Sequence, residues 1–205
     1  MLTQPCPVAA LPGFVQGDVS VQDAAAQRAA PLLLQGLPRG QALRVLDACA
    51  APGGKAAHLL EMAPSLQVLA LDSDASRLER VHENLARLHL RAEVRAGDAR
   101  QPDAWWDGTP FDAILLDAPC SASGIVRRHP DIPWLRRASD VVALAQTQAQ
   151  LLQSLWSLLA PGGVMVYASC SLFKAEGEHQ IDAFLQRPTP SPPKLDAASP
   201  GHLQP

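Results

Sequence analysis

Two cysteines follow aliphatic runs in the second half of the chain, and cysteine is the most nucleophilic side chain near neutral pH. Cys120 comes after Leu116-Asp117-Ala-Pro, and Cys170 comes after Tyr167-Ala-Ser. If both runs are adjacent parallel strands, both thiols lie at one edge of the sheet. A lone cysteine is more often a small buried residue, but this pair indicates covalent attack on an electron-poor carbon. The pattern does not tell which thiol attacks.

A loop of small residues follows the first aliphatic run, in Asp47-Ala-Cys-Ala-Ala-Pro-Gly-Gly-Lys55. In an open α/β sheet the ligand lies outside the carboxyl ends of the strands, where backbone amides of a tight turn approach it. A Walker A loop would need glycine at Cys49 and Ser or Thr at Ala56, and the G-x-G-x-x-G spacing is also missing. The loop therefore predicts a nucleotide-like cofactor of another kind, with a plain tight turn as the alternative. We interpret Cys49 itself as a packing residue.

Acidic residues stand at the carboxyl ends of three successive strand or turn segments, at Asp72, Asp98 and Asp117. We expect them to line one crevice. Asp72 lies about 20 residues beyond the glycine turn, where an acid binds ribose hydroxyls in nucleoside-binding sheets. Asp74 is the competing choice. Because Asp72 directly ends the apolar run, we assign it the ribose and assign Asp74 to the cap of the next helix.

The elements that must position these residues are short aliphatic runs alternating with amphipathic segments, a pattern typical of parallel strands joined by crossover helices. The runs are mostly apolar on both faces, as buried parallel strands are. We predict an α/β fold with a mostly parallel sheet and helices on both faces. The expected strands are Leu43–Asp47, Val68–Asp72, Ala92–Ala96, Asp112–Asp117 and Gly163–Ala168.

Apolar spacing and breaker residues predict the helices. An alanine-rich helix near the N-terminus should end or kink at Pro31. The longest helix should begin at a cap formed by Ser139 or Asp140 and should stop before Pro161. The other expected helices cover Lys55–Met62, Arg77–Leu88, Asp140–Leu159 and the segment that contains Ile181 and Phe184.

Composition fits one soluble globular core of 205 residues, with 47% hydrophobic and 18% charged residues. The sequence contains no apolar stretch of the ~18 residues that span a bilayer and no secretory leader, so we expect a cytoplasmic, monomeric protein. Its four cysteines form no C-x-x-C pair, so we expect free thiols and no metal. The net charge of -3 argues against binding nucleic acid by bulk electrostatics alone.

The chain divides into three parts by composition. Residues 1–21 form a glycine-punctuated lead-in segment, and residues 22–186 form the catalytic domain. Residues 187–205 are rich in proline, which excludes regular structure and predicts a disordered tail.

Five segments carry a family resemblance: DACAAPGGK, LDSD, AGDAR, LLDAPCSASGIVRRHPDIPWLRR and YASCS. In this order and spacing they resemble the RNA cytosine-5 methyltransferases of the Fmu/Sun family, over roughly Pro12–Gln186. The motif DAPCSASG with a later S-C-S differs from the loop of amino-methyltransferases, which usually ends in an aromatic residue after two prolines. The resemblance implies a Rossmann-like, class I S-adenosylmethionine-dependent methyltransferase fold and 16S ribosomal RNA as the substrate.

The same resemblance implies roles for individual residues. Cys170 would add to carbon 6 of cytosine so that carbon 5 accepts the methyl group, and Asp117 would steady the ring at its nitrogen-3 edge beside the methyl donor. Cys120 would help to remove the carbon 5 proton and release the product. S-adenosylmethionine would bind with its ribose at Asp72, its adenine near Asp98, and the remainder along Asp117 and the loop residues Cys49, Ala50, Ala51, Pro52, Gly53, Gly54 and Lys55.

A short basic segment, Arg127, Arg128 and His129, precedes Pro130-Asp131-Ile132-Pro133-Trp134. It suits phosphate contact and stacking near a base held out of its helix, and a solvated loop is the alternative. Lys55 is expected to orient near the cofactor or the catalytic aspartate, or to be solvated.

Family members of this type usually carry an amino-terminal helical RNA-binding domain and further strands after the last helix. We expect this chain to lack both and to have an open sheet edge. Three other functions remain open: a cofactor-binding or interaction domain without turnover, a nicotinamide-dependent oxidoreductase, and a methyltransferase for protein or small molecules. The intact thiols argue against the first, the missing glycine fingerprint argues against the second, and replacement of Cys170 would test the third.

Overall fold

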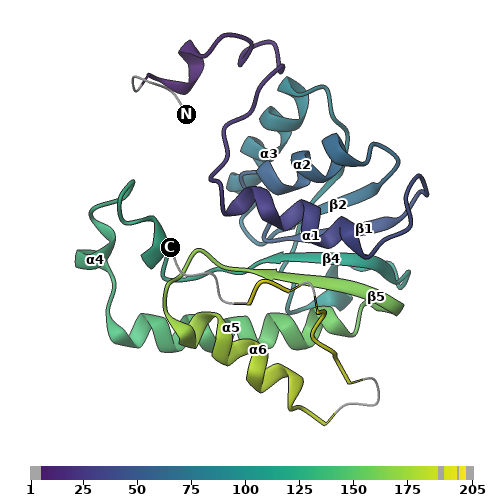
Figure 1. Cartoon of the computed structure of the whole chain (residues 1–205), viewed down its shortest axis with the longest axis vertical. Helices are drawn as coiled ribbons and strands as arrows, with labels where there is room; N and C mark the ends of the chain where they lie inside the picture. The colour runs from purple at the N-terminus through teal and green to yellow at the C-terminus, as the bar shows by residue number, and fades with distance from the viewer. Residues whose placement is uncertain (1–5, 189–191, 198, 202–205) are drawn as a thin grey trace.

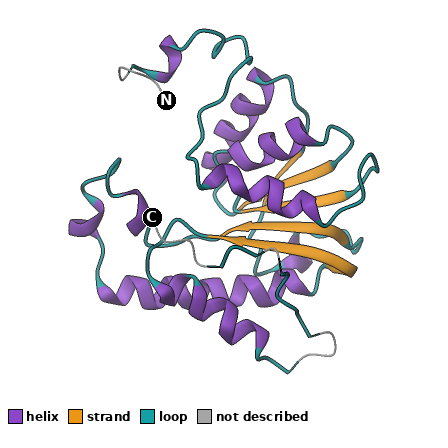
Figure 2. Cartoon of the chain, in the orientation of Figure 1, coloured by secondary structure: helices purple, strands orange, loops and turns teal. Residues whose placement is uncertain are grey.

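The computed structural model describes residues 6–188, 192–197 and 199–201. In this part of the chain a five-stranded parallel sheet has the order β3-β2-β1-β4-β5 (Figure 2). All five predicted strands are confirmed, with ends that move by one residue except at the start of β5. The strands are β1 (Arg44–Ala48), β2 (Gln67–Asp72), β3 (Glu93–Ala96), β4 (Phe111–Asp117) and β5 (Leu159–Ala168).

Helices cover both faces of the sheet (Figure 1). Successive strand residues point to opposite faces, so Val45 and Leu115 pack in one apolar core while Leu46 and Leu116 pack in the other. The predicted α/β fold with two helical layers is therefore confirmed. One layer consists of α1 (Ala29–Gln35), α2 (Gly54–Met62) and α3 (Ala75–Arg87), and the other consists of α5 (Ala138–Trp156) and α6 (Glu178–Leu185).

Two predictions about helix ends are wrong. Pro31 does not end a helix, because α1 begins at Ala29 and places Pro31 in its first turn. A first-turn N–H has no partner within the helix, so proline loses nothing there. Neither Ser139 nor Asp140 is the N-cap of α5, because the helix begins at Ala138 and Arg137 is the N-cap. Asp140 takes part in the cap in another way. It lies in the first turn and accepts a hydrogen bond from the backbone N–H of Arg137, at 2.8 Å.

The segment around Pro161 differs from the prediction as well. Helix α5 ends at Trp156, and β5 begins at Leu159, four residues earlier than expected. Leu159 pairs with Phe111 and Val164 pairs with Ala113, so the intervening residues bulge out of register. A bulge tolerates proline because the missing N–H has no partner strand to serve.

The lead-in segment is held on α3 by one arginine. The Arg87 guanidinium donates to the carbonyl oxygens of Phe14 (2.8 Å) and Val19 (3.0 Å) and lies 4.0 Å from the Phe14 ring centroid. A side chain at Gly17 would place its Cβ 2.1 Å from the Arg87 carbonyl oxygen, so only glycine permits this approach. The division between lead-in and catalytic domain at residue 21 remains a prediction.

The predicted tail is only partly described. Residues 187–188, 192–197 and 199–201 contain no helix or strand, while 189–191, 198 and 202–205 lie outside the described residues, as do 1–5 of the lead-in. Within the described ranges no helix is both long enough and apolar enough to cross a membrane.

Candidate functional site

The small-residue loop lies at the carboxyl end of β1 and leads directly into α2. Gly53 is the residue before the helix and has a φ of 94°, a left-handed conformation that glycine adopts without strain. A Cβ at Gly53 would lie 3.1 Å from the Val81 side chain of α3. The loop therefore turns tightly against the neighbouring helix, with Ala50, Ala51 and Gly53 buried.

Asp72 is fixed beneath this loop. Its side chain is buried, with 2% exposed, and accepts hydrogen bonds from the backbone N–H groups of Ala51 and Asp74, both at 3.1 Å. The Arg77 guanidinium contacts both residues of the Asp72–Ala51 pair. It lies 3.5 Å from the Asp72 carboxylate and donates to the Ala51 carbonyl oxygen at 3.0 Å. Asp72 thus ties the end of β2 to the loop after β1.

Asp74 caps α3, as predicted. Its carboxylate accepts from the backbone N–H of Ser76 at 2.9 Å, which is the standard bond of an N-cap residue. The hydrogen bonds from Ser76 lower the pKa of Asp74. This carboxylate is engaged by its own helix, which leaves Asp72 as the acid that faces the loop.

A pocket opens between the carboxyl ends of β1, β2 and β3 and the helix α5. It brings together three predicted residues: Cys49, Asp72 and Asp98. The Arg100 guanidinium binds the Asp98 carboxylate, with its Nη2 at 2.7 Å, and these hydrogen bonds lower the pKa of Asp98. The remaining lining residues are Leu71, Ser73, Gly97, Ala99, Arg100, Pro119, Thr147 and Leu151.

Asp117 lies at the end of β4 and is paired with Lys55 of α2. Lys55 Nζ and Asp117 Oδ2 are 2.6 Å apart, so Lys55 is not simply solvated but lies beside Asp117, as one of its predicted places requires. Asp47, fully buried at the end of β1, is close to both. Burial, reinforced by the charge of Asp117, raises the pKa of Asp47 to about 8. Asp117 is not among the pocket residues, so only two of the three predicted acids line one crevice.

The two predicted thiols lie side by side. Cys120 Sγ and Cys170 Sγ are 3.3 Å apart, because β4 and β5 are neighbours and Asp117 pairs with Ala168 at the end of the register. The hydrogen bond from the Cys170 thiol lowers the pKa of Cys120 to about 6. The same contact, together with burial, raises the pKa of Cys170. The thiol–thiol hydrogen bond therefore favours a state in which the two sulfur atoms share one proton.

The loops that carry the thiols touch through their backbones. Gly124 N–H donates to the Cys170 carbonyl oxygen at 2.8 Å, and a Cβ at Gly124 would lie 2.6 Å from that oxygen. Gly124 does not have a positive φ, so space and not conformation requires glycine here.

Cys49 behaves differently from the thiol pair. It is half-buried, packs against the core under α5, and has a pKa raised to about 12 by burial and by the negative charges of Asp72 and Asp117. A thiol with this pKa stays protonated at neutral pH. The interpretation of Cys49 as a packing residue agrees with this environment, although its backbone also borders the pocket.

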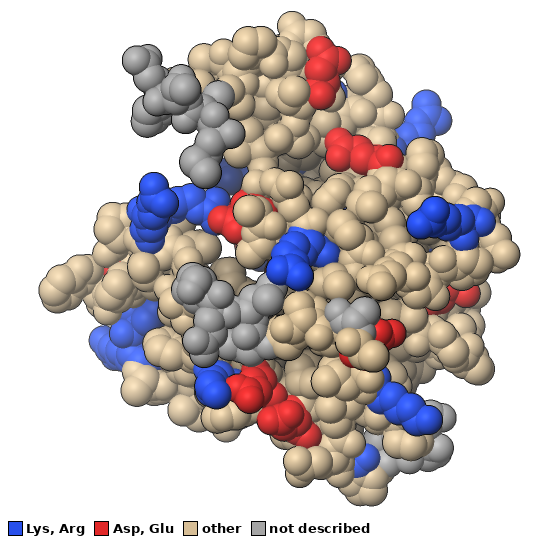
Figure 3. Space-filling view, viewed as in Figure 1, with Lys and Arg blue, Asp and Glu red and all other residues tan. Residues whose placement is uncertain are grey.

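The basic segment is exposed beside the thiol loops. Arg127, Arg128 and His129 all face solvent, and Arg128 lies 3.4 Å from the Asp23 carboxylate, two residues after the lead-in. Helix α4 (Ile132–Leu135) follows and carries Trp134, whose side chain is 90% exposed. On the face drawn in Figure 3, positive and negative side chains are interspersed and form no broad basic field.

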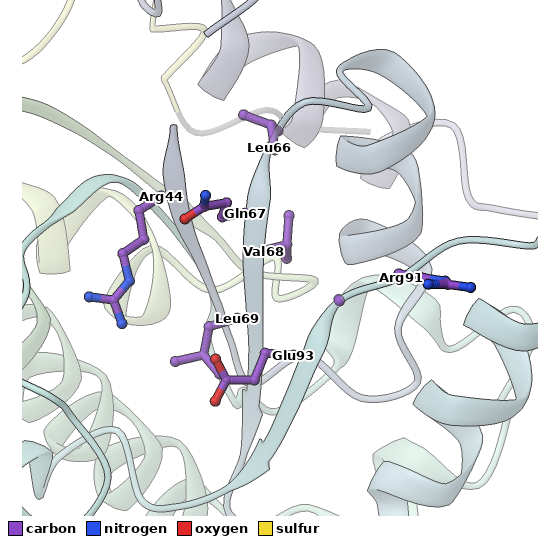
Figure 4. Close-up of a pocket in the computed structure, with 8 residues that line it drawn as sticks. Arg44, Leu66, Gln67, Val68, Leu69, Arg91 and Glu93 are labelled. Atoms are coloured by element: carbon purple, nitrogen blue, oxygen red, sulfur yellow. The ribbon is translucent and has the colours of Figure 1, made fainter. Parts of the chain in front are cut away.

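A second hollow lies at the opposite edge of the sheet, among the first residues of β1, β2 and β3 (Figure 4). Two of its three charged residues, Arg44 and Glu93, are already paired with other side chains. Arg44 binds Asp107 through two nitrogens, at 2.8 and 2.7 Å, and Glu93 pairs with Arg95. Ligands of parallel α/β sheets bind at the carboxyl ends of the strands, so this hollow is not the candidate site.

Sequence reasoning missed several residues of the site. Arg100 and Thr147 line the pocket, and Glu176 is buried behind the thiols. Arg100 had one local signal, since it lies two residues after Asp98. Thr147 and Glu176 come from α5 and from the turn before α6, so only the tertiary fold brings them to the site.

The strand order, the two helical layers and the pocket at the carboxyl ends of the strands define a Rossmann-like methyltransferase fold. The sequence profile described as 16S rRNA methyltransferase RsmB/F matches residues 35–194. The chain belongs to this family.

Named relatives agree with this assignment. Ribosomal RNA small subunit methyltransferase B of Vibrio cholerae is 55% identical over 202 residues, which cover 98% of this chain and 45% of the relative. The protein of the same name from Shewanella oneidensis is 56% identical over 187 residues, which cover 91% and 43%. The chain thus spans less than half the length of these relatives.

Two solved structures from Pyrococcus horikoshii share the fold. NSun6, solved with SFG, superposes with a TM-score of 0.77 at 29% identity, covering 87% of this chain and 45% of that one. A structure described as a methyltransferase homolog protein superposes with a TM-score of 0.73 at 31% identity, covering 89% and 56%.

Proposed function

We propose that this chain transfers a methyl group from S-adenosylmethionine to carbon 5 of a cytosine in 16S ribosomal RNA, through a covalent bond to Cys170. The observation that carries the proposal is the thiol pair, 3.3 Å apart and next to a pocket lined by two carboxylates. The names of the family and of its relatives support ribosomal RNA as the substrate. A methyltransferase without covalent catalysis would have no use for two adjacent thiols.

The pocket fits S-adenosylmethionine in its chemistry. Asp72 is a fixed carboxylate suited to ribose hydroxyls, and Asp98 faces the same pocket with Leu71 and Leu151 as apolar walls for a base. The loop Cys49, Ala50, Ala51, Pro52, Gly53, Gly54 and Lys55 would hold the amino-acid part with its backbone. When bound, the cofactor supplies an electrophilic methyl group. The relative solved with SFG, an S-adenosylmethionine analogue, supports this choice.

In the proposed reaction Cys170 Sγ forms a bond to carbon 6 of the cytosine. Its proton passes to the Cys120 thiolate and on to water, since Cys120 is only partly buried. Asp117, oriented by Lys55, steadies the ring at its nitrogen-3 edge. Once carbon 5 is methylated, Cys120 removes the carbon 5 proton, the bond between Cys170 and carbon 6 breaks, and the electron pair returns to Cys170 Sγ. The net products are 5-methylcytosine, S-adenosylhomocysteine and one proton.

The exposed basic segment is the proposed contact for the RNA. Arg127, Arg128 and His129 would bind phosphates, and the exposed Trp134 would stack on a base. Phosphate contacts made by a few side chains agree with the absence of a broad basic field on the drawn face (Figure 3).

Methyl transfer from labelled S-adenosylmethionine to unmodified 16S ribosomal RNA tests the proposal, with the product nucleoside identified by mass spectrometry. We expect 5-methylcytosine from the wild-type chain and none from Cys170→Ala. Replacing Cys120 by alanine should trap a protein–RNA adduct that resists denaturation. Cys6→Ala is the matched control, because Cys6 is exposed and far from the site in sequence.

Two results would contradict the proposal. Methyl transfer that survives Cys170→Ala would exclude the covalent route and favour a different substrate. Transfer without any adduct in Cys120→Ala would remove the release role from Cys120.

A further inference from the structure

A buried carboxylate lies behind the thiol pair and belongs to none of the predicted motifs. Glu176 ends the short 3-10 helix Lys174–Glu176 and is fully buried. Four donors converge on its two carboxylate oxygens. They are Ser121 N–H (2.8 Å), the Ser121 hydroxyl, the Ser171 hydroxyl (2.6 Å) and the Gln148 side-chain amide (3.2 Å).

The two serines are the immediate neighbours of the two cysteines. Ser121 follows Cys120 on the loop after β4, and Ser171 follows Cys170 on the loop after β5. One carboxylate therefore bonds both cysteine loops at once. A single atom joins the two loops, because the hydroxyls of Ser121 and Ser171 both donate to Glu176 Oε2.

Glu176 is itself anchored to rigid elements. The Tyr167 hydroxyl of β5 donates to the Glu176 carbonyl oxygen at 2.7 Å. Gln148 of α5 uses the same amide nitrogen to donate to Glu176 and to the Pro119 carbonyl oxygen at 2.8 Å, which fixes the start of the Cys120 loop. The sheet, the long helix and both loops thus meet at this side chain.

Separating the loops would be costly in this arrangement. A buried carboxylate that loses its donors is left as an uncompensated charge, and such a loss is among the largest penalties in a protein interior. Other contacts also join the two loops. Gly124 N–H donates to the Cys170 carbonyl oxygen, Leu172 N–H donates to the Ser123 hydroxyl at 2.8 Å, and the Ser171 hydroxyl lies 3.1–3.2 Å from those of Ser123 and Ser121. Each of these is a neutral hydrogen bond, which is weaker than one to a carboxylate. The hydrogen bonds of Ser121 and Ser171 to the Glu176 carboxylate are therefore the strongest connection between the two loops.

We propose that Glu176 is a positioning residue that sets the separation of the Cys120 and Cys170 sulfur atoms by holding Ser121 and Ser171 together. The proposal rests on the proposed function in one respect, namely that these thiols perform the chemistry. It adds a residue that touches neither substrate nor cofactor and that acts only through the two loops.

Disulfide formation between the thiols measures their separation without RNA or cofactor. Diamide takes one hydrogen from each thiol, so the sulfurs join and the reagent becomes the hydrazine. Trypsin places Cys120 in the peptide 101–127 and Cys170 in the peptide 138–174, so mass spectrometry quantifies this cross-link apart from Cys6 and Cys49. We expect Glu176→Ala to slow the cross-link about ten- to hundred-fold, since a misplacement of about 1 Å has effects of this size.

Glu178 provides the matched control. It lies two residues away in the first turn of α6 and forms a surface ion pair with Lys174 at 2.9 Å. Glu178→Ala should cross-link at the wild-type rate, because exposed ion pairs contribute little. Glu176→Gln should restore most of the rate, because the amide oxygen still accepts from Ser121 N–H and the serine hydroxyls can turn to accept from the amide.

A folded Glu176→Ala chain that cross-links at the wild-type rate would overturn the proposal. If Glu176→Ala gives no cooperative thermal transition, Ser171→Ala takes its place. This variant removes the bond from the Cys170 loop to Glu176, together with the weaker contacts of the same hydroxyl with Ser121, Ser123 and the Phe173 N–H. It should slow the cross-link about three- to ten-fold, the size of one hydrogen bond. An unchanged rate in Ser171→Ala would then overturn the proposal.

Methyl transfer gives the second readout. The Glu176→Ala variant should lose kcat in proportion to its cross-linking rate while its affinity for S-adenosylmethionine stays at the wild-type value. If no variant and no wild-type chain transfers methyl groups, the proposed function fails, yet the cross-link still decides the role of Glu176.

Discussion

The two halves of the site are built in different ways. The cofactor half, at the ends of β1, β2 and β3, holds its acids by contacts that span at most 21 residues, as Asp98 binds Arg100 and Asp72 binds the Ala51 N–H. The thiol half, at the ends of β4 and β5, depends on contacts across 50 and 55 residues, from Cys120 to Cys170 and from Ser121 to Glu176. The polar groups of the first half come mainly from residues 49–100, whereas the second half exists only after β4, β5 and the turn before α6 have assembled.

This difference indicates that the two halves should fail separately. Damage to the cofactor half should weaken cofactor affinity and leave the thiol separation unchanged. Damage to the thiol half should do the reverse. Lys55 and Asp47 lie where the halves meet, since both are close to Asp117.

The largest expected effect concerns stability at this junction. The folded chain holds the Asp47 proton up to about pH 8, whereas the unfolded chain releases it near 3.8. The folded state therefore binds the extra proton between these values, and wild-type stability falls as pH rises, by up to about 1.4 kcal/mol per unit. Asp47→Asn cannot ionise, so urea unfolding should show it several kcal/mol more stable relative to wild type at pH 8 than at pH 4.

A difference between the two chains that is the same at both pH values would contradict this assignment. If Asp47→Asn also changed the rate of the Cys120–Cys170 cross-link, the two halves would be coupled through the junction. The expectation that they respond independently would then be wrong.

The next effect concerns the cofactor half alone. Asp72→Asn should weaken S-adenosylmethionine binding by about 1.5–3 kcal/mol, the value of a hydrogen bond to a charged group, which is roughly ten- to hundred-fold in Kd. Isothermal titration calorimetry measures it. The cross-link rate should stay at the wild-type value, and unchanged cofactor affinity would move the ribose role to Asp74.

The third effect concerns the thiol half alone. Because the pKa of Cys120 is lowered to about 6, its thiolate accepts the Cys170 proton above this pH and is lost below it. The rate of methyl transfer should fall about ten-fold per pH unit below 6. Alkylation of Cys120 by iodoacetamide, followed on peptide 101–127, should show the same midpoint without RNA, and a midpoint near 9 would contradict it.

The smallest effect separates capping from binding. Asp74→Ala should lower the free energy of unfolding by about 1 kcal/mol, because α3 loses its N-cap. Thermal denaturation measures the loss. Cofactor affinity should not change, and a loss as large as that of Asp72→Asn would show that both acids serve the ligand.

The sequence predicted the parts of the molecule that depend on local patterns. Apolar runs located all five strands, the Gly53 turn located the loop, and the cap at Asp74 was recognised from its position. Neighbouring strands were enough to predict that Cys120 and Cys170 would meet, which the structure confirms. The residue roles at the site remain predictions.

The errors lie where tertiary contacts decide. Pro31 was expected to break a helix and instead occupies a first turn, a distinction that depends on where the helix begins. The bulge around Pro161 depends on the register between β4 and β5. Glu176 had no signal, because an isolated glutamate is usually solvated and only its four donors identify it as buried.

The approach of Gly124 to the Cys170 backbone makes this position a place for engineering. A single methyl group there would meet the carbonyl oxygen at 2.6 Å and push one loop from the other, without replacing any cysteine or acidic residue. Larger side chains would widen the gap in steps. A series of substitutions at position 124 therefore offers a way to increase the distance between two reactive sulfur atoms step by step, without replacing either cysteine.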